Sequence, residues 1–193
     1  MPRRKANTVR IIGGRWRSRL LEFPDIAGLR PSPDRVRETL FNWLGQNLDG
    51  WHCLDLFAGS GALGFEALSR GAESVVMVEK QFAALRALEE NTRRLKATNL
   101  QLVRADALEF ARDARSRFDL VFLDPPFALG LQAQALALLP SLLAPGGQVY
   151  LESDAAFEAP AGWVMLKRGR AGNVYFHLLG RGSDDQSGVS GNV

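Results

Sequence analysis

The sequence predicts an α/β protein built on a mostly parallel sheet with helices on both faces, and three observations support this fold class. From residue 51 onward, short apolar runs alternate with longer helical segments, which is the pattern of a parallel sheet. A glycine-rich turn follows the first of these runs, as in ligand-binding connections between a strand and a helix. Two strand-like runs near the C-terminus are so close together that they can pair only as antiparallel strands.

Composition places the chain among ordinary globular proteins. Its 193 residues are 46% hydrophobic and 23% charged, enough for one domain with a substantial core. No apolar run approaches the roughly 18 residues of a membrane span, and the first ten residues lack the apolar stretch of a signal peptide. The single cysteine, Cys53, excludes an internal disulfide, and the two histidines have no zinc-ligand spacing. We therefore expect a reduced, cytoplasmic monomer without a metal and without membrane contact.

Residues 1–47 are expected to form a basic arm made of a β-hairpin and a helix. Strands are predicted at 9–12 and 16–23 around a glycine pair, and a helix over 34–47 with Ser32 as its N-cap and Pro33 as its first residue. Residues 1–40 carry a net charge of +6 and the rest of the chain −3. Basic side chains gain free energy by displacing counterions from phosphates, so a nucleic acid is the expected partner and a solvated tail the alternative. The candidate RNA-binding residues, expected to project from the hairpin and its flanks, are Arg10, Arg15, Arg17, Arg19, Arg30 and Arg35.

The alternating segments predict a second region over residues 48–181. Its expected strands are 52–56, 74–78, 100–104, 118–123 and 147–152, and its expected helices are 63–69, 81–96, 107–114 and 131–143. The closing antiparallel pair is 164–167 with 174–179. Residues 182–193 are rich in Gly, Ser and Asp and are expected to be disordered.

The first expected ligand-binding element is the loop after the first strand. Gly59, Gly61 and Gly64 match the G-x-G-x-x-G spacing, which brings backbone amides and a helix N-terminus close to a ligand. This spacing also fits a dinucleotide site, and such glycines can be purely structural. The candidate cofactor-binding residues here are Asp55, Phe57, Ala58, Gly59, Ser60 and Gly61.

Carboxylates follow the next two strands. Glu79 can accept hydrogen bonds from both hydroxyls of a ribose, although a Glu at a helix start is also favoured by the helix dipole. Its neighbour Lys80 is a further candidate contact. Asp106 can receive an adenine amino group, and the Ala107 amide can address the ring, while the simpler role of Asp106 is a helix N-cap. One residue can fill both roles.

The most specific feature is the tetrapeptide Asp124-Pro125-Pro126-Phe127 after the fourth strand. Its two prolines have no backbone N–H and stiffen the chain, so the Asp124 carboxylate and the Pro125 carbonyl form a fixed pair of acceptors. Phe127 supplies a flat apolar face beside them. Two acceptors and a stacking face suit a planar ring with an exocyclic amine, so these four residues are the candidate catalytic residues, and Asp124 is also a candidate cofactor contact.

In these residues the sequence resembles the class I S-adenosylmethionine-dependent methyltransferases, and within them the amino-methylating branch with the motif (D/N)-P-P-(F/Y). Over residues 9 to about 180 it is similar to the RsmD-type family, whose own motifs correspond to residues 10–14, 29–32 and 35–44. The resemblance implies a Rossmann-like, seven-stranded sheet with an antiparallel C-terminal hairpin. Ser32 stands where Thr is more often expected, and the tail beyond Arg181 has no counterpart.

The resemblance also implies an activity: methylation of guanine N2 in small-subunit (16S) ribosomal RNA, of the guanine-966 type. Asp55, Gly59 and Gly61 would hold the methionine end of S-adenosylmethionine, Glu79 the ribose, Asp106 and Ala107 the adenine, and residues 124–127 the target base. The expected partner is ribosomal RNA or a small-subunit particle.

Other functions remain open at this point. Asp124-Pro125-Pro126-Phe127 is also compatible with methylation of adenine N6 in DNA or of a glutamine amide in a protein, because each presents an amide-like nitrogen. A nicotinamide-dependent oxidoreductase would use the same glycine loop but would leave Asp124 to Phe127 without a role. An RNA-binding module without catalysis would not need an intact site.

Overall fold

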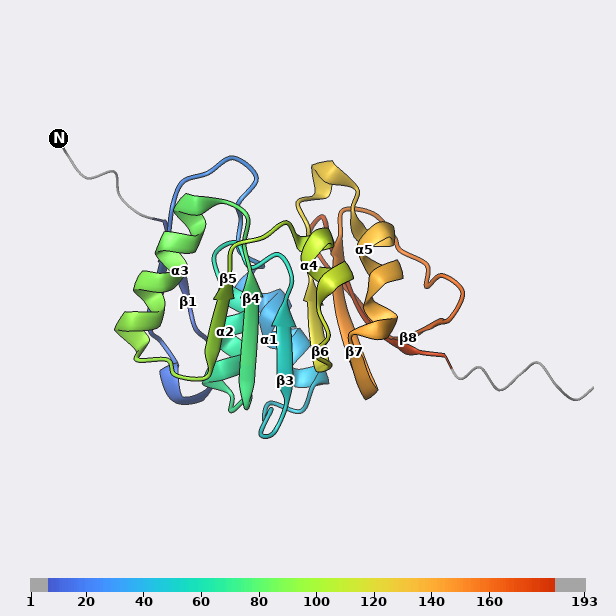
Figure 1. Ribbon diagram of the computed structural model, residues 1–193, viewed down its shortest axis with the longest axis horizontal. Coiled ribbons are helices and arrows are strands. Elements are labelled where there is room, and N and C mark those ends of the chain that lie inside the picture. The colour runs from blue at the N-terminus through green and yellow to red at the C-terminus, as the bar shows by residue number, and fades with distance from the viewer. Residues whose placement is uncertain (1–6, 183–193) are drawn as a thin grey trace, which may run out of the picture.

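The structure is a computed structural model that describes residues 7–182, and its centre is a seven-stranded sheet (Figure 1). The strand order is β5-β4-β3-β6-β7-β9-β8. β3 to β7 run parallel, and β9 is antiparallel to both β7 and β8, as the sequence predicted. The strands are β3 (His52–Asp55), β4 (Ser74–Val78), β5 (Leu100–Val103), β6 (Phe118–Leu123), β7 (Leu143–Ser153), β8 (Trp163–Ala171) and β9 (Val174–Arg181).

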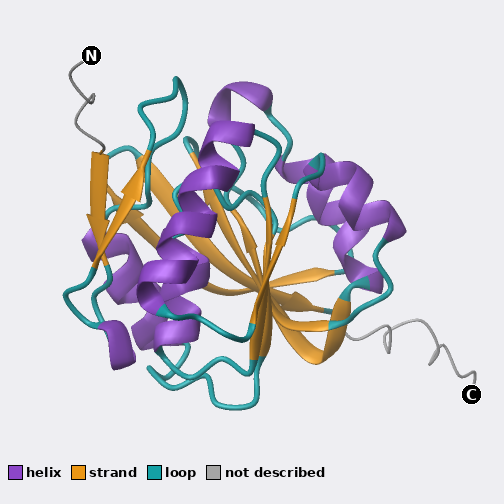
Figure 2. Ribbon diagram, turned by 60° about the vertical axis from the view of Figure 1, so that its left-hand side comes forward, coloured by secondary structure: helices purple, strands orange, loops and turns teal. Residues whose placement is uncertain are grey.

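Helices cover both faces of this sheet (Figure 2). α1 (Asp34–Trp43), α2 (Ala62–Ser69) and α3 (Phe82–Leu95) pack on one face, and α4 (Ala107–Asp113) and α5 (Gln132–Leu138) on the other. Because successive side chains of a strand point to opposite faces, Cys53 joins the first core and Leu54 the second. The predicted α/β class is thereby confirmed.

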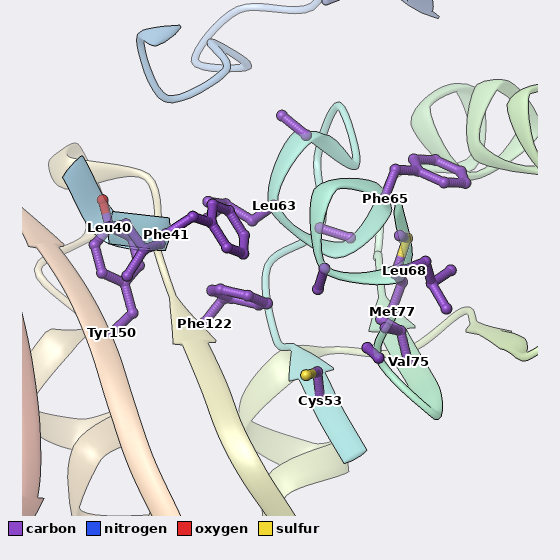
Figure 3. Close-up of a cluster of buried hydrophobic side chains, with 14 of the residues drawn as sticks. Leu40, Phe41, Cys53, Leu63, Phe65, Leu68, Val75, Met77, Phe122 and Tyr150 are labelled. Carbon is purple, nitrogen blue, oxygen red and sulfur yellow. The ribbon is translucent and has the colours of Figure 1, made fainter. Parts of the chain in front are cut away.

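The core under α1 and α2 is rich in aromatic residues (Figure 3). The ring of Phe122 lies 6.3 Å from that of Phe41 and 6.3 Å from that of Tyr150, in tilted and edge-on arrangements. Cys53 is fully buried beneath α2, and burial raises its pKa well above the ordinary value. A protonated, buried thiol is a packing group rather than a nucleophile.

The predicted N-terminal hairpin is present, but its strands are shorter than expected. β1 (Asn7–Arg10) pairs with β2 (Leu20–Phe23), so residues 11 and 12 and residues 16–19 are not in strands. A 3-10 turn, η1 (Gly14–Trp16), and Ser18 at φ 69° fill the connection instead. The glycine pair serves close packing: a Cβ on Gly14 would lie 1.8 Å from the carbonyl oxygen of Ser69.

Two helix predictions need correction. α1 ends at Trp43 rather than at residue 47, because Gly45 and Gln46 take positive φ values. Ser32 is not its N-cap: Pro33 occupies that position. The predicted helix 131–143 is α5 followed by a 3-10 turn, η3 (Leu139–Ser141), and β7 already begins at residue 143 rather than 147.

Some expectations fall outside the described part of the chain. Arg3, Arg4 and Lys5 of the basic arm and residues 183–193 of the tail are among the residues outside 7–182. Within that range, none of the helices has the length and apolarity needed to span a bilayer. A boundary at residue 47 stays a prediction, while the hairpin and α1 share one core with α2 and the sheet.

Candidate active site at the carboxyl edge of the sheet

The predicted site residues gather where the parallel strands end, which we call the carboxyl edge. The loop between β3 and α2 and the first turn of α2 need their glycines for positive φ angles and for close packing. Gly59 takes φ 51°, and Gly61 takes φ 77° and also has Leu88 and Phe65 within 2.8 Å of where a Cβ would be. Gly64 lets α2 approach the sheet, since a Cβ there would lie 2.4 Å from Met77. The loop is therefore built for tight turns beside a helix N-terminus.

Asp55 ends β3 and is almost completely buried beneath this loop. Its Oδ2 accepts a hydrogen bond from the Gly64 amide at 3.0 Å. Burial raises the pKa of Asp55 to about 7, the Gly64 bond opposes that rise, and the nearby charge of Glu79 adds to it. Asp55 is thus a carboxyl group poised to ionise near neutral pH when a cation is placed beside it.

Glu79 links the glycine loop to the end of β4. Its Oε2 accepts a hydrogen bond from the Gly59 amide at 2.9 Å, and its Oε1 accepts one from the Gln81 amide at 2.6 Å. A carboxylate has about four lone-pair positions, so each oxygen can accept a further bond from a ligand hydroxyl. The Ala58 amide also donates to the Val78 carbonyl at 3.0 Å, which fixes the loop against β4.

Asp106 is the N-cap of α4, the simpler of the two roles considered for it. Its Oδ1 accepts hydrogen bonds from the amides of Leu108 at 3.0 Å and Glu109 at 3.4 Å. Its Oδ2 lies 3.1 Å from the Lys80 ammonium, which is the main cause of its lowered pKa. The Ala107 amide is in the first turn, where helical amides have no intrahelical acceptor. Both groups lie at the same edge as Glu79.

Asp124 follows β6 directly and is partly buried, with Pro125 buried behind it and Pro126 exposed. Phe127 opens a 3-10 turn, η2 (Phe127–Leu129), and is half-buried. β6 lies beside β3, so Asp124 and Asp55 are close enough for their charges to interact. Of the glycine-loop residues, Phe57 is half-buried and Ser60 is buried.

The structure adds three residues to the site that the sequence alone did not predict there. The Ser32 hydroxyl donates to Asp124 Oδ2 at 3.4 Å, and Ser32 is near enough to Glu152 to lower the pKa of that carboxyl group. The Tyr150 hydroxyl donates to Glu152 Oε1 at 2.6 Å, and both residues are buried in β7. The available signal was Glu152 itself, a carboxylate inside an otherwise apolar strand.

This cluster changes the ionisation of Asp124. Burial raises the pKa of Asp124 well above its ordinary value, and the charges of Glu152 and then Asp55 raise it further, against the hydrogen bond from Ser32. Burial also raises the pKa of Glu152, while Ser32, Tyr150 and the charge of Arg37 oppose that rise. Full negative charges on both Asp124 and Glu152 would therefore repel each other, so ionisation of one carboxyl group makes ionisation of the other less favourable.

A second buried network docks the N-terminal segment on α2. Glu66 is fully buried and accepts hydrogen bonds from the amides of Ile12 at 2.9 Å and Gly13 at 2.8 Å. It also pairs with Arg37 at 3.2 Å and Arg70 at 2.8 Å, so all of its lone-pair positions are used. Four partners offset the cost of burying this charge.

Arg37 connects the Glu66 network to Ser32 at the candidate active site. Its Nε donates to the Ser32 carbonyl at 3.1 Å, and its Nη2 donates to the Arg10 carbonyl at 2.9 Å. The same side chain has no exposed surface and pairs with Asp34 at 2.5 Å. The sequence placed Arg37 only among the charges of the basic arm, but it is a structural cation.

The six candidate RNA-binding arginines are all exposed or partly exposed, but the structure divides them between two edges of the sheet. Arg30 and Arg35 flank Ser32, in a segment that lies at the top of Figures 1 and 2 near the glycine loop. The η1 connection, which contains Arg15, lies at the bottom. There the Trp16 amide donates to Ser69 Oγ at 2.9 Å, at the end of α2.

The other three arginines are placed by similar contacts. Arg19 donates to the Arg94 carbonyl at 3.5 Å, close to the C-terminus of α3, and so lies at the edge opposite the acids. Arg17 lines a hollow of about 600 Å³ at the same edge. Arg10 lies in β1, where it pairs with Asp34 at 3.3 Å. The predicted ribbon of projecting arginines is therefore wrong in form, because Arg15, Arg17 and Arg19 lie in the connection.

No group of three or more His, Cys, Asp or Glu side chains in residues 7–182 has the arrangement of a metal site. The chemistry available at the carboxyl edge is that of hydrogen-bond acceptors, helix N-termini and a half-buried aromatic ring.

Comparisons with known proteins identify the family of the chain and structures with a similar fold. A family described as "Conserved hypothetical protein 95" matches residues 9–180. "Ribosomal RNA small subunit methyltransferase D" of Escherichia coli (strain K12) is 42% identical over 184 residues, covering 93% of each chain. The protein of the same name from Haemophilus influenzae is 42% identical over 178 residues, covering 88% of this chain and 92% of that one. A solved structure titled "Putative methyltransferase yhhF from Escherichia coli" superposes with a TM-score of 0.81 at 42% identity, covering 91% of this chain and 98% of the other.

Proposed function

The chain belongs to the Conserved hypothetical protein 95 family, the RsmD-type methyltransferases, and from this we propose that it methylates small-subunit ribosomal RNA with S-adenosylmethionine as methyl donor. We propose further that the methylated atom is N2 of a guanine, of the guanine-966 type. The observation that carries the proposal is the Asp124-Pro125-Pro126-Phe127 turn beside the Asp55 loop at one edge of the sheet.

The residues at the carboxyl edge fit S-adenosylmethionine. Asp55 and the glycine loop would hold its methionine end, where a cationic ammonium suits a carboxyl group with a pKa of about 7. Glu79 would take the ribose hydroxyls with its remaining lone pairs, and Asp106 and Ala107 would take the adenine. Lys80 would orient Asp106. When bound, the cofactor supplies an activated methyl group on a sulfonium.

The protein then has to activate a poor nucleophile, the base amine. The lone pair of an exocyclic amine on a base is delocalised into the ring. Asp124 and the Pro125 carbonyl would accept its two hydrogens, favour a pyramidal nitrogen and stabilise the positive charge that develops on it. Phe127 would stack on the base, which has to leave its helix to reach the pocket. Fixing the amine in line with the carbon–sulfur bond of the methyl group lowers the barrier by positioning the nucleophile for displacement.

The decisive experiment is mass spectrometry of nucleosides from ribosomal RNA of cells with and without the gene. We expect the N2-methylguanosine content of small-subunit RNA to fall when the gene is absent. Parallel digests of DNA and protein test the other amine substrates, because loss of N6-methyladenine or of methylglutamine there would assign the chain to them instead. Purified protein with naked RNA and with assembled particles then identifies which form is the substrate. A nicotinamide titration beside one with S-adenosylmethionine tests the oxidoreductase alternative.

A further inference from the structure

We propose that the hydroxyl oxygen of Ser32 accepts the N1 hydrogen of the target base and thereby makes the site selective for guanine. This inference rests on the proposed function, because it assumes that the base amine is bound by Asp124. It assigns a role in substrate selection to Ser32, whose hydroxyl donates to Asp124.

Ser32 is held rigidly at the site. Pro31 and Pro33 restrict the backbone on both sides of it, and the buried Arg37 donates to its carbonyl at 3.1 Å. Its hydroxyl lies 3.4 Å from Asp124 Oδ2, the carboxylate proposed to bind the amine. A substrate amine that binds to the Asp124 carboxylate therefore lies next to the Ser32 hydroxyl oxygen.

The groups around Ser32 leave its hydroxyl oxygen as an acceptor toward a substrate. A serine hydroxyl has one hydrogen and two lone pairs. That hydrogen is donated to Asp124 Oδ2, and the buried Glu152 is a second carboxyl group close to Ser32. Glu152 stays in place because the Tyr150 hydroxyl donates to it at 2.6 Å. With its hydrogen held by a carboxylate, Ser32 offers a third group only its lone pairs.

The proposed site would thus present three acceptors to the base: the Pro125 carbonyl, Asp124 and Ser32. The Watson–Crick edge of guanine carries two hydrogens on N2 and one on the adjacent N1, three donors in a row. Adenine, cytosine and a glutamine amide each carry an acceptor next to their amine. Bound in the same way, that acceptor would face the Ser32 oxygen with no hydrogen between them, an unpaired arrangement that costs binding free energy.

The test is an atomic substitution in the RNA. A short substrate RNA is made with guanine or with 2-aminopurine at the target position; 2-aminopurine keeps the N2 amine but has an acceptor at N1. Single-turnover methyl transfer is measured for both RNAs with the wild type, Ser32→Ala and Ser32→Thr. Ser153→Ala is the matched control, because that hydroxyl donates to the nearby Ala155 carbonyl at 2.8 Å. Cofactor affinity of each variant confirms that the site is folded.

We expect the wild type, Ser32→Thr and Ser153→Ala to prefer guanine by about tenfold or more, the value of one well-made hydrogen bond. In Ser32→Ala the preference should fall by about tenfold relative to the wild type. Comparing the preference of each variant with that of the wild type cancels the effect of the O6 atom that 2-aminopurine also lacks, because every variant meets the same pair of RNAs.

Two outcomes count against the proposal in different ways. A wild type that methylates guanine, with a preference that Ser32→Ala leaves unchanged, overturns the role of Ser32 and leaves the proposed function standing. A wild type that transfers no methyl group to the guanine RNA or to the assembled particle overturns the proposed function, and this inference with it.

Discussion

We expect the carboxyl group of Asp55 to make cofactor binding sensitive to pH near neutrality. Burial raises its pKa from 3.8 to about 7, so the folded protein holds this proton below about pH 7. A cationic ammonium favours the ionised form, and binding below that pH has to remove the proton first. We expect the dissociation constant for S-adenosylmethionine to rise as pH falls from 8 to 6, by at most about tenfold per pH unit below the pKa. Isothermal titration across this range measures it.

The matched variant is Asp55→Asn, which keeps an oxygen for the Gly64 amide but cannot ionise. It should bind more weakly at pH 8 and show a flat pH dependence. A wild-type affinity independent of pH would remove Asp55 from contact with the cofactor cation.

We expect Glu79 to accept hydrogen bonds both from the Gly59 amide of the loop and from the ribose hydroxyls of the cofactor. Replacing it by Ala removes the acceptor for the Gly59 amide and two charge-assisted bonds to the ribose, each worth about 1.5–3 kcal/mol. Affinity for S-adenosylmethionine should therefore fall by about a hundredfold or more, in titrations that contain EDTA. Glu79→Gln, which retains one acceptor oxygen, should fall less, and equal affinity of Glu79→Ala and wild type would contradict the assignment.

Asp124 should affect chemistry far more than cofactor binding. Removal of one preorganised electrostatic interaction typically costs about 10²–10³ in rate. We expect a decrease of that size for Asp124→Ala in single-turnover methyl transfer with saturating cofactor. Asp124→Asn keeps an acceptor oxygen and should be the faster of the two variants. A rate for Asp124→Ala within a few-fold of wild type would exclude the proposed role.

At the scale of elements, the two groups of arginines should differ in what they do. Arg30 and Arg35 lie next to the acceptor cluster, whereas Arg15 and Arg17 lie at the opposite edge. Removing one cation that binds a phosphate should reduce the slope of log affinity against log salt by about 0.7 on single-stranded or 0.9 on duplex-like RNA. We expect Arg30→Gln/Arg35→Gln to reduce both that slope and the rate of methyl transfer. Arg15→Gln/Arg17→Gln should reduce the slope alone, measured on the same RNA or particle.

An unchanged slope in the second variant would mean that the η1 connection does not contact RNA. Recognition would then be confined to the carboxyl edge. There Phe82 is 56% exposed, with the guanidinium groups of Arg86 and Arg104 at 5.9 Å and 5.3 Å from its ring. In that case we would expect its ring to be a further surface on which a base stacks.

The sequence predicted the elements that follow strong periodic patterns and missed those shaped by packing. β4 and β6 match their predicted ranges, because each is a bounded run of apolar residues. The predicted strand residues 16–19 were wrong, since Gly14 has to pack against Ser69 and the chain turns there. That packing joins segments far apart in the sequence, and no local pattern reports it.

The same distinction holds for the site. Asp55, Glu79, Asp106 and Asp124 each lie at or just after the end of a strand, so one rule about parallel sheets locates all four. Ser32 looked like a helix cap because it precedes a proline and a helical pattern. Its true partners, Asp124 and Glu152, depend on how the segment before α1 crosses the sheet.

At the scale of the whole molecule, Glu66 joins the hairpin connection, α1 and α2 into one body. Breaking a buried, fully partnered charge leaves uncompensated cations and typically costs about 3–5 kcal/mol. We expect Glu66→Gln to lower the free energy of unfolding by an amount of that order, measured by urea denaturation. Glu73→Gln, at an exposed position, should stay within about 0.5 kcal/mol of wild type. A similar small effect at Glu66 would mean that the hairpin docks by apolar packing alone.

The separation of Ser32 and Glu152 in the sequence also sets the order in which parts of the site can form while the chain is synthesised. Ser32 leaves the ribosome early, but Glu152 lies in β7, which needs β9 as its neighbour in the sheet. A nascent chain can complete the glycine loop and Asp124 long before it can complete the acceptor row. If Ser32 selects the base as proposed, the growing chain can acquire that selectivity only after β7 and β9 have been synthesised.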